Sequence, residues 1–498
     1  MSRINSNIPS MIAQRVSSLN NRSLAGTLEK LSTGYRINRG SDDPAGLIAS
    51  ENLRGEIKGI NAAIGNAQRA EQVMNVAEGG LAEISNMLVE VQSLVGQSAN
   101  DAGMSAEEKE ANQLQIDNLL SSIDRIANSV SFQGTKLLNG NFDYTLSGNY
   151  TAADGIADVS INSVKLSDTA GAVRSVDITV TQSAQTARQY IQLSAGGAIE
   201  NGGSGAVTFE IAGARGAQQF SFASGTSRAD MVAAINAFSE ALGVSASLSG
   251  AANAVRIDST GYGSDAYVRV REIANANDTT NFISTVGTGG TVSADLRAEG
   301  RDATVNINGV VAVARGLTAR VALDGFDVGI TLTATGAGSI NTVGGTQSFD
   351  ITGGGADFNL APDVNLAGKV SLGIETVTTA NLGNSTSGFL SALKSGGDAN
   401  VENGNLTKAQ EILDLATKQI SSLRGRIGAF TKNVVGSTIN SLGVTLENTT
   451  AAESAIRDTD FASETASMTR NQILIQASTQ ALAMANSSPQ AVLSLMRG

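Results

Sequence analysis

The stretch 456–496 constrains the fold of this chain more than any other. Its apolar residues recur at seven-residue spacing, and most of its other positions are Ser, Thr, Gln or Asn. That spacing places the apolar residues along one side of a helix, where a partner helix can pack. Few other interactions would hold such a helix in water, so we expect it to be stable only when packed. The members of this C-terminal stripe are Phe461, Met468, Ile475, Leu482 and, beyond Pro489, Met496.

The stretch 4–35 has the same character and is the natural partner of that helix. Periodicity alone also allows an ordinary core helix at either end. The polar flanks carry few charges, and we expect that one copy of the chain cannot bury both stripes. Contacts between copies that do not close on themselves give an open helical filament. The packing residues expected in this N-terminal stripe are Ile8, Ile12, Val16, Leu19, Leu24, Leu28 and Leu31.

Further helices are expected at 44–100, 105–130 and 405–450. The first two are separated by a short turn, which favours an antiparallel hairpin within a helical bundle. Apolar residues repeat along each of them with helical spacing. The expected core residues of this inner bundle are Ile60, Met74, Leu81, Leu88, Val95, Ile116, Ile123 and Val130.

Particular residues mark the ends and a weak point of these helices. Asp43 and Ser105 are expected N-caps, because their side chains can accept hydrogen bonds from the first free N–H groups. Gly79-Gly80 interrupts the long helix at about 1 kcal/mol per Gly relative to Ala. The pair therefore indicates a point where another segment approaches closely.

The composition changes near residue 140. From there to about 390 the chain is rich in Gly, Ala, Thr and Val, with an alternation typical of strands. One helix is expected inside this region, at 230–242. The predicted fold class is therefore α+β and multidomain, with a long helical coiled coil and bundle made from both chain ends and a β-rich central insert. The clearest predicted strands lie at 206–213, 218–225, 266–273, 303–316 and 326–336.

The composition argues against several classes of function. The chain has no Cys and no His, which removes thiol nucleophiles, imidazole bases and the H-E-x-x-H zinc motif. A net charge of −12 argues against a nucleic-acid or anionic-membrane partner. We expect no enzyme, no cofactor and no metal site, although a carboxylate-pair or Ser–Lys enzyme remains formally open. Acidic pairs such as Asp42-Asp43 are interpreted as helix caps.

The chain has no apolar run of about 18 residues, so we expect no membrane insertion. Residues 1–16 lack the continuous apolar core of a secretory signal peptide. We therefore expect either a cytoplasmic protein or one that is exported without a cleaved signal. The absence of Cys suits a chain that stays unfolded during export.

The motif LSTGYRINRGSDDPAGLIASENL at 31–53 resembles bacterial flagellin. AIRDTDFASE at 455–464 and LAMANSSPQAVLSL at 482–495 match the same family at the other end of the chain. The resemblance implies a secreted, self-assembling subunit of the flagellar filament, used in motility and passed through a type III export route. It also implies a coiled coil of the two terminal helices in the filament core.

The resemblance divides the chain into nested parts. Residues 1–42 and 456–498 would form the terminal coiled coil. Residues 43–173 and 346–455 would form the inner bundle with β-hairpins, and 174–345 would form surface-exposed outer domains. Within the insert, 206–272 resembles a module of hook-associated proteins, and 302–335 is similar to a module of filament-cap proteins.

The resemblance also implies partners. They are further copies of the chain, a flagellar export chaperone at the C-terminal helix, and the hook-associated junction and cap proteins. A hook–filament junction protein is the alternative, since it shares the terminal helices, although the motifs at 31–53 and 482–495 favour flagellin. A secreted adhesin or enzyme carried on the insert is a further alternative.

One departure concerns recognition by the innate immune receptor for flagellin. Receptor-activating flagellins carry an Arg at the position of Glu90, whereas Val91 and Leu94 match their pattern. Replacing a cation by an anion at a contact should be costly. We therefore expect weak signalling, and a reporter-cell assay showing the potency of an activating flagellin would contradict this.

Overall fold

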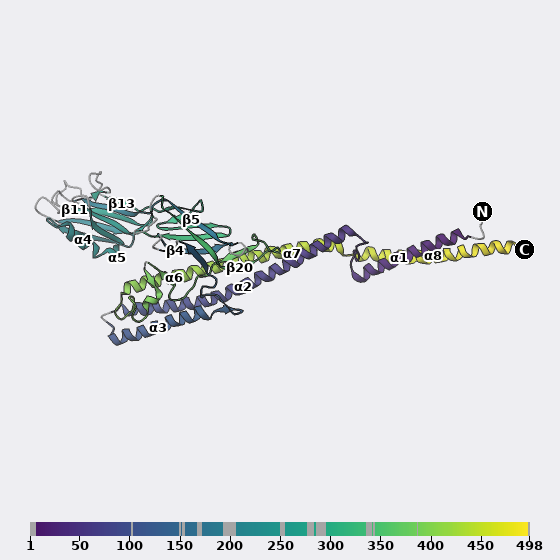
Figure 1. Cartoon of the computed structure of the whole chain (residues 1–498), viewed down its shortest axis with the longest axis horizontal. Coiled ribbons are helices and arrows are strands. Elements are labelled where there is room, and N and C mark those ends of the chain that lie inside the picture. The colour runs from purple at the N-terminus through teal and green to yellow at the C-terminus, as the bar shows by residue number, and fades with distance from the viewer. Residues whose placement is uncertain are drawn as a thin grey trace. The chain divides into compact units, whose positions relative to one another are not determined.

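The computed structural model describes residues 6–100, 103–148, 151, 155–166, 172–192, 206–249, 254–275, 283–284, 295–334, 341, 344–385 and 387–496. Contacts divide the chain into two compact units, shown with their helices and strands in Figure 1. The first unit holds residues 1–71, 359–368 and 432–498, and the second holds 72–358 and 369–431. No helix within the described ranges combines the length and the hydropathy that a membrane span requires.

The first unit is helical. Helix α1 (Ile8–Thr33) lies along α8 (Phe461–Met496), as Figure 1 shows. The first part of α2 (Pro44–Ser98) and helix α7 (Gly436–Arg457) share a small apolar cluster of Ile60, Ala63 and Leu442. This unit therefore brings the two ends of the chain together, as their matching patterns predicted.

The helix predicted at 405–450 is confirmed, and it contains one irregular turn. Helix α6 (Leu406–Ala429) is followed by one turn of π-helix at Phe430–Val435, and α7 then continues to Arg457. A π-helical turn inserts an extra residue into the helical repeat. The apolar positions before and after it therefore belong to different faces, which single-period reasoning cannot detect.

The second unit contains the rest of α2, together with α3 (Ala106–Ser129) and α6. The predicted bundle residues in this unit are buried, except Val130. Val130 follows the last residue of α3, where its N–H donates to the Ile126 carbonyl at 3.0 Å, and its side chain is half-buried. The buried ones are Met74, Leu81, Leu88, Val95, Ile116 and Ile123, and Ile60 is equally buried in the first unit.

The predicted caps are present. The Asp43 carboxylate accepts a hydrogen bond from the Gly46 N–H at 2.9 Å, at the start of α2. Ser105 and Glu108 form a reciprocal capping box at the start of α3. Each cap satisfies N–H groups that have no partner within the helix.

The two glycines of α2 differ in their surroundings. A Cβ on Gly80 would lie 2.8 Å from the Val130 side chain and 2.9 Å from that of Leu138, whereas a Cβ on Gly79 would meet no atom within 4 Å. The predicted close approach therefore exists at Gly80 alone, where the segment after α3 crosses α2.

This difference gives a matched pair of substitutions. We expect Gly80→Ala to destabilise the protein by about 1–3 kcal/mol, because overpacking outweighs the better helix propensity. Gly79→Ala should stabilise it by up to about 1 kcal/mol. Urea unfolding followed by circular dichroism would measure both, and equal shifts for the two variants would contradict the assignment.

A β-sandwich lies in the second unit. A sheet in the order β15-β14-β5-β19-β3 and a sheet in the order β16-β17-β18-β4 enclose one hydrophobic core. Strand β18 alternates buried and half-buried residues along its whole length, as a strand with one face on a core requires. The strands are β3 (Tyr144–Gly148), β4 (Ile156–Val164), β5 (Arg174–Gln182), β14 (Thr304–Ile307), β15 (Val310–Val311), β16 (Val313–Arg315), β17 (Thr318–Leu323), β18 (Phe326–Leu332) and β19 (Thr346–Gly354).

A smaller module is inserted between β5 and β14. Its sheets run β12-β6-β10-β9 and β13-β11-β7-β8, around a separate core that includes Phe209. The single helix predicted at 230–242 is two helices, α4 (Arg228–Asn236) and α5 (Ser239–Leu242). The strands are β6 (Thr186–Gln192), β7 (Ala206–Gly213), β8 (Ala217–Ala223), β9 (Val244–Leu248), β10 (Ala254–Tyr262), β11 (Tyr267–Asn275), β12 (Ile283–Ser284) and β13 (Asp295–Glu299).

Short elements complete the second unit and its connections. The predicted strand at 303–316 is three short strands, because Asn308-Gly309 makes a tight turn with positive φ at both residues. The remaining elements are β1 (Ser131–Phe132), β2 (Thr135–Lys136), β20 (Ala356–Asn359), β21 (Lys369–Leu372), β22 (Gly383–Asn384), β23 (Gly388–Phe389) and the 3-10 helix η2 (Leu390–Leu393).

The β-sandwich crosses the domain boundaries expected from the sequence. Strands β3, β4 and β19 lie outside the expected outer region of 174–345, yet they share a core with β5 and β18 inside it. The boundaries expected at 173/174 and 345/346 therefore pass through one sandwich. The division into coiled coil, bundle and outer region stays a proposal about roles.

Candidate subunit interface

Helix α1 is capped at both ends. The Asn7 side chain accepts a hydrogen bond from the Ser10 N–H at 3.1 Å, and Pro9 lies in the first turn, where its missing N–H is not needed. At the other end, Gly34 adopts a left-handed conformation (φ 77°) and its N–H donates to the Lys30 carbonyl at 2.9 Å. Local sequence therefore defines where this helix starts and stops.

Polar residues occupy the interior of the α1–α8 pair. Among the described side chains of the two helices, the buried ones are Thr27 and Ser478. The Asn471 amide donates to the Thr27 hydroxyl at 3.1 Å, and the Asn7 amide donates to the Ala485 carbonyl at 2.8 Å. Sequence reasoning missed these residues, because Ser, Thr and Asn were interpreted as solvent-facing flanks. Their recurrence on both helices was the signal that could have identified them.

The two apolar stripes are only partly buried against each other, as we expected for one copy of the chain. Ile12 is 49% exposed and Phe461 is 57% exposed, because small and polar residues take the positions between the helices. Leu24, Leu31, Met468, Ile475 and Leu482 are half-buried, and the side chain of Met496 lies outside the described residues. The large apolar side chains that α1 and α8 leave exposed are Ile8, Met11, Ile12, Val16, Leu19, Leu28, Phe461, Ile473, Leu474 and Met484.

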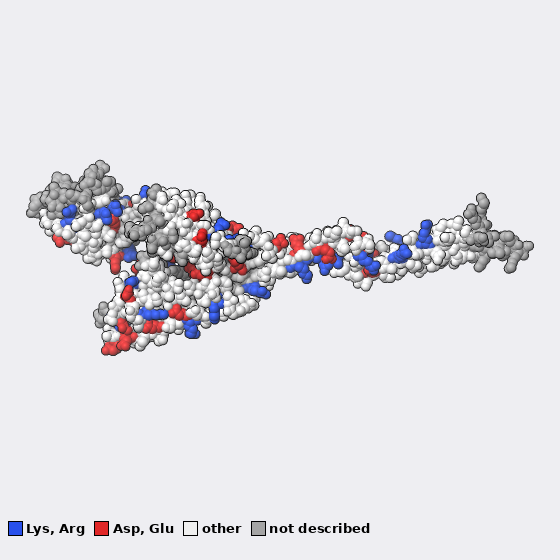
Figure 2. All heavy atoms as spheres, viewed as in Figure 1, with Lys and Arg blue, Asp and Glu red and all other residues white. Residues whose placement is uncertain are grey.

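An open apolar groove runs along this helix pair. Pro9, Ile12 and Val16 line it from α1, and Ala481 and Ala485 line it from α8. The two helices carry four cations and two carboxylates over their whole length, and Figure 2 shows how few charges they present. A surface that is apolar, grooved and weakly charged favours packing against another protein surface.

The segments next to α1 and α8 pair with each other. The Arg36 N–H donates to the Arg457 carbonyl at 2.7 Å, and a β-bridge joins Tyr35 to Asp458. The Arg457 guanidinium lies 4.9 Å from the centre of the Tyr35 ring and 2.9 Å from the Glu51 carboxylate. Hydrogen bonds from Arg54 and Arg457 hold the pKa of Glu51 below its usual value. This antiparallel pairing of the two segments sets the register of α1 against α8.

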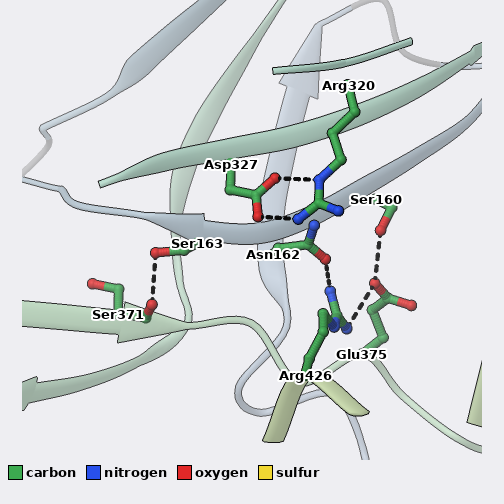
Figure 3. A network of polar contacts seen from close by, with 8 residues as sticks. All are labelled: Ser160, Asn162, Ser163, Arg320, Asp327, Ser371, Glu375 and Arg426. Carbon is green, nitrogen blue, oxygen red and sulfur yellow. Dashed lines mark hydrogen bonds and ion pairs between the residues drawn. The ribbon is translucent and has the colours of Figure 1, made fainter. Parts of the chain in front are cut away.

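A polar network in the second unit joins the sandwich to α6 (Figure 3). Arg426 of α6, whose side chain is 16% exposed, donates to the Asn162 amide oxygen and to the Glu375 carboxylate at 3.2 Å. The Ser160 hydroxyl donates to the same carboxylate at 3.1 Å. One guanidinium therefore ties strand β4 and the segment after β21 to the helix.

Asp143, next to this network, is half-buried. Burial, together with the nearby Glu375 charge, raises the pKa of Asp143 to about 6, although hydrogen bonds from the Tyr144 and Thr376 backbone act in the opposite direction. The charged form is therefore disfavoured in the folded protein. The resulting loss of stability is full above about pH 6, shrinks as the pH falls below 6, and disappears only below the ordinary value of 3.8.

Asp143→Asn should remove this pH dependence. Asn keeps the oxygen that accepts from the Tyr144 N–H and carries no charge. We expect the gain in stability of the variant to be about 1–2 kcal/mol larger at pH 8 than at pH 4.5. Urea unfolding of both proteins at the two pH values tests this, and an equal gain at both would contradict it.

The three residues expected at the receptor contact differ in their exposure to solvent. Glu90 is exposed on α2, whereas Val91 and Leu94 are buried in the bundle. Only Glu90 of the three therefore presents its side chain to a partner. Weak receptor signalling stays a prediction.

Comparison with known proteins identifies the family. The model of the bacterial flagellin N-terminal helical region matches residues 4–143, and that of the C-terminal helical region matches residues 410–496. Flagellin B of Helicobacter pylori is 30% identical over 99% of both chains. This chain belongs to the flagellin family. The B-type flagellin of Pseudomonas aeruginosa is 29% identical over 99% of both chains.

The insert also has relatives. The flagellin hook IN motif matches residues 208–261, within the module that resembled hook-associated proteins. A crystal structure of the D2-D3 domains of the flagellar cap protein of Serratia marcescens is similar at 18% identity and a TM-score of 0.27, covering 39% of this chain and 97% of that one. A similarity that low supports no argument about the insert.

Membership of the flagellin family confirms several predictions. The α+β fold class with helical ends is confirmed, and the chain is a structural subunit of the bacterial flagellar filament, located outside the cell. Flagellins are a structural protein family, not an enzyme family. The roles of particular residues remain to be assigned from the structure.

Proposed function

We propose that α1 and α8 are the segments through which this flagellin-family subunit polymerises. The observation that carries the proposal is the set of ten large apolar side chains that are exposed among the described residues of the two helices. Within the described part of the first unit, no surface covers them. Neighbouring copies, presenting the same helices, would cover them in a filament.

The free energy gained by burying these apolar side chains is large enough to favour assembly. Burying the exposed part of each side chain contributes about 1 kcal/mol, and so about 10 kcal/mol per subunit before ordering costs. The few charges on these helices keep the cost of removing them from water low. Contacts between different faces of successive copies then propagate without closing.

We also propose that the terminal helices order on assembly. Much of the apolar area of the free pair faces water, so the ordering entropy is poorly offset in a monomer. Limited proteolysis of the monomer would then trim both ends before the bundle. Ends that resist as well as the bundle would contradict this.

The remaining partners follow from the same surface. An export chaperone would bind α8 of an unassembled chain, where Ile473, Leu474 and Met484 are exposed. The hook-associated junction and cap proteins would bind the faces that remain free at the two filament ends. Export of the unfolded chain belongs to the same proposal.

Seeded polymerisation tests the proposal. Full-length monomer and a variant lacking residues 456–498 are added to filament seeds, pelleted and examined by negative-stain electron microscopy. We expect long filaments from the full chain only. Growth by the truncated variant would contradict assembly through α8, and short caps on seeds from the full chain would favour a junction protein.

A further inference from the structure

We propose that the edge strand β8 of the inserted module pairs with β8 of a second copy in the assembled filament. The inference rests on the proposed polymerisation, which brings copies of the module close together. It concerns a surface outside the terminal helices and the bundle.

Three other edges of these sheets, those of β9, β4 and β13, are closed or charged. The Asn236 amide covers the edge of β9, because its oxygen accepts from the Ala246 N–H at 2.7 Å and its nitrogen donates to the Ala246 carbonyl at 2.9 Å. The edge of β4 is covered by the segment around β21, where the Ser163 hydroxyl donates to the Ser371 carbonyl at 2.7 Å. Strand β13 carries three charged residues in five positions. Covering and charge are the usual protections of an edge against pairing with another chain.

Strand β8 has neither protection among the described residues. It is the edge of its sheet, it pairs with β7 in continuous register from Ala206–Ala223 to Ala212–Ala217, and it contains no charged residue, no Pro and no bulge. Gln219 and Ser221 are exposed on it, while Phe220 and Phe222 are buried in the module. Its free backbone groups therefore form an uninterrupted template for another strand.

An aromatic side chain lies next to this edge strand. Phe238, 45% exposed, packs edge-on against Phe220 with 5.6 Å between the ring centres. A strand added to β8 would shield part of this ring. Half-exposed aromatic side chains of this kind are common anchors in protein interfaces.

The sequence of β8 favours a second copy as the occupant. Antiparallel pairing centred on Phe220 places Gln219 opposite Ser221 of the other copy, and Ala217 opposite Ala223. No charge opposes another charge in this arrangement, and small side chains face each other on the outer side. The two-fold pairing joins the modules of two subunits and leaves no strand of the pair uncovered.

The pairing should depend on assembly. A strand of seven residues is about 24 Å long, and pairing it buries well under the roughly 800 Å² per partner of a stable interface. Free monomers would therefore pair little. Subunits held in a filament present the same strand at an effective concentration in the millimolar range, where weak pairing is populated.

Disulfide trapping tests the pairing, because the chain has no Cys of its own. Filaments are copolymerised from equal amounts of the single variants Gln219→Cys and Ser221→Cys, oxidised mildly and analysed on a non-reducing gel. We expect at least a fivefold higher yield of covalent dimers from these filaments than from the same two monomers mixed without seeds.

A matched control tests the register. Gln219→Cys copolymerised with Ala223→Cys places the two thiols out of register and should give little dimer. Equal yields from the two mixtures would overturn the pairing, and so would intact filaments without dimers. Because electron microscopy scores the filaments separately, a failure of full-length wild-type chain to polymerise would instead contradict the proposed function.

Discussion

Ile12→Asp will abolish elongation of the filament and leave the folded monomer intact. Ile12 lies in the apolar groove of the helix pair and is half exposed, so the free chain tolerates a charge there within about 0.5 kcal/mol. Once a neighbouring copy covers the groove, the same charge is buried without a partner, at a cost of several kcal/mol. A cost of about 3 kcal/mol raises the critical concentration about 100-fold.

Ser18→Asp is the matched control for this substitution. Ser18 is exposed on the same helix and does not line the groove, so the added charge is the same and only its place differs. The critical concentration from sedimentation of seeded reactions should change by less than about tenfold. Equal inhibition by the two variants would show that added charge on α1, not the groove, controls assembly.

Arg426→Met will destabilise the second unit by about 2–3 kcal/mol. The substitution keeps much of the aliphatic volume and removes the donors to Asn162 and Glu375. Asn162 is 9% exposed, so the loss of its donor leaves its amide oxygen desolvated and without that hydrogen bond, whereas Glu375, at 37% exposed, can be rehydrated. We expect the loss in urea unfolding, together with faster hydrogen exchange in β4, since Arg426 links that strand to α6.

Arg424→Met is the control for the loss of a charge from the same helix. Arg424 also forms an ion pair, with Glu78 at 2.8 Å. Both side chains of this pair are more than one-third exposed. Exposed pairs contribute about 0–1 kcal/mol, so this variant should lose less than about 1 kcal/mol. Equal losses at the two positions would mean that the network around Arg426 contributes no more than a surface ion pair.

The helices and the bundle core could be predicted because their signals are local or periodic. The Asp43 and Ser105 caps depend on residues within one turn, and residues such as Leu81 and Ile123 repeat with the period of a helix facing one core. The motifs at 31–53 and 455–464 led to the family for the same reason, since they are contiguous. Strand β7 was predicted from the strand-like alternation of residues in its sequence, which the structure shows as alternating burial.

The candidate interface was predicted only in part. The sequence by itself determined that both chain ends are weakly charged amphipathic helices, that they pair, and that the insert is β-rich. Tertiary structure alone decided that Thr27 and Ser478 are the described side chains buried between those helices, while the residues of the apolar stripes stay half-buried or exposed. It also decided that one sandwich core spans the expected domain boundary. The physical reason is that periodicity shows which residues share a face of a helix or strand, whereas which face is buried depends on partners distant in the chain and, in a subunit that assembles, on other copies.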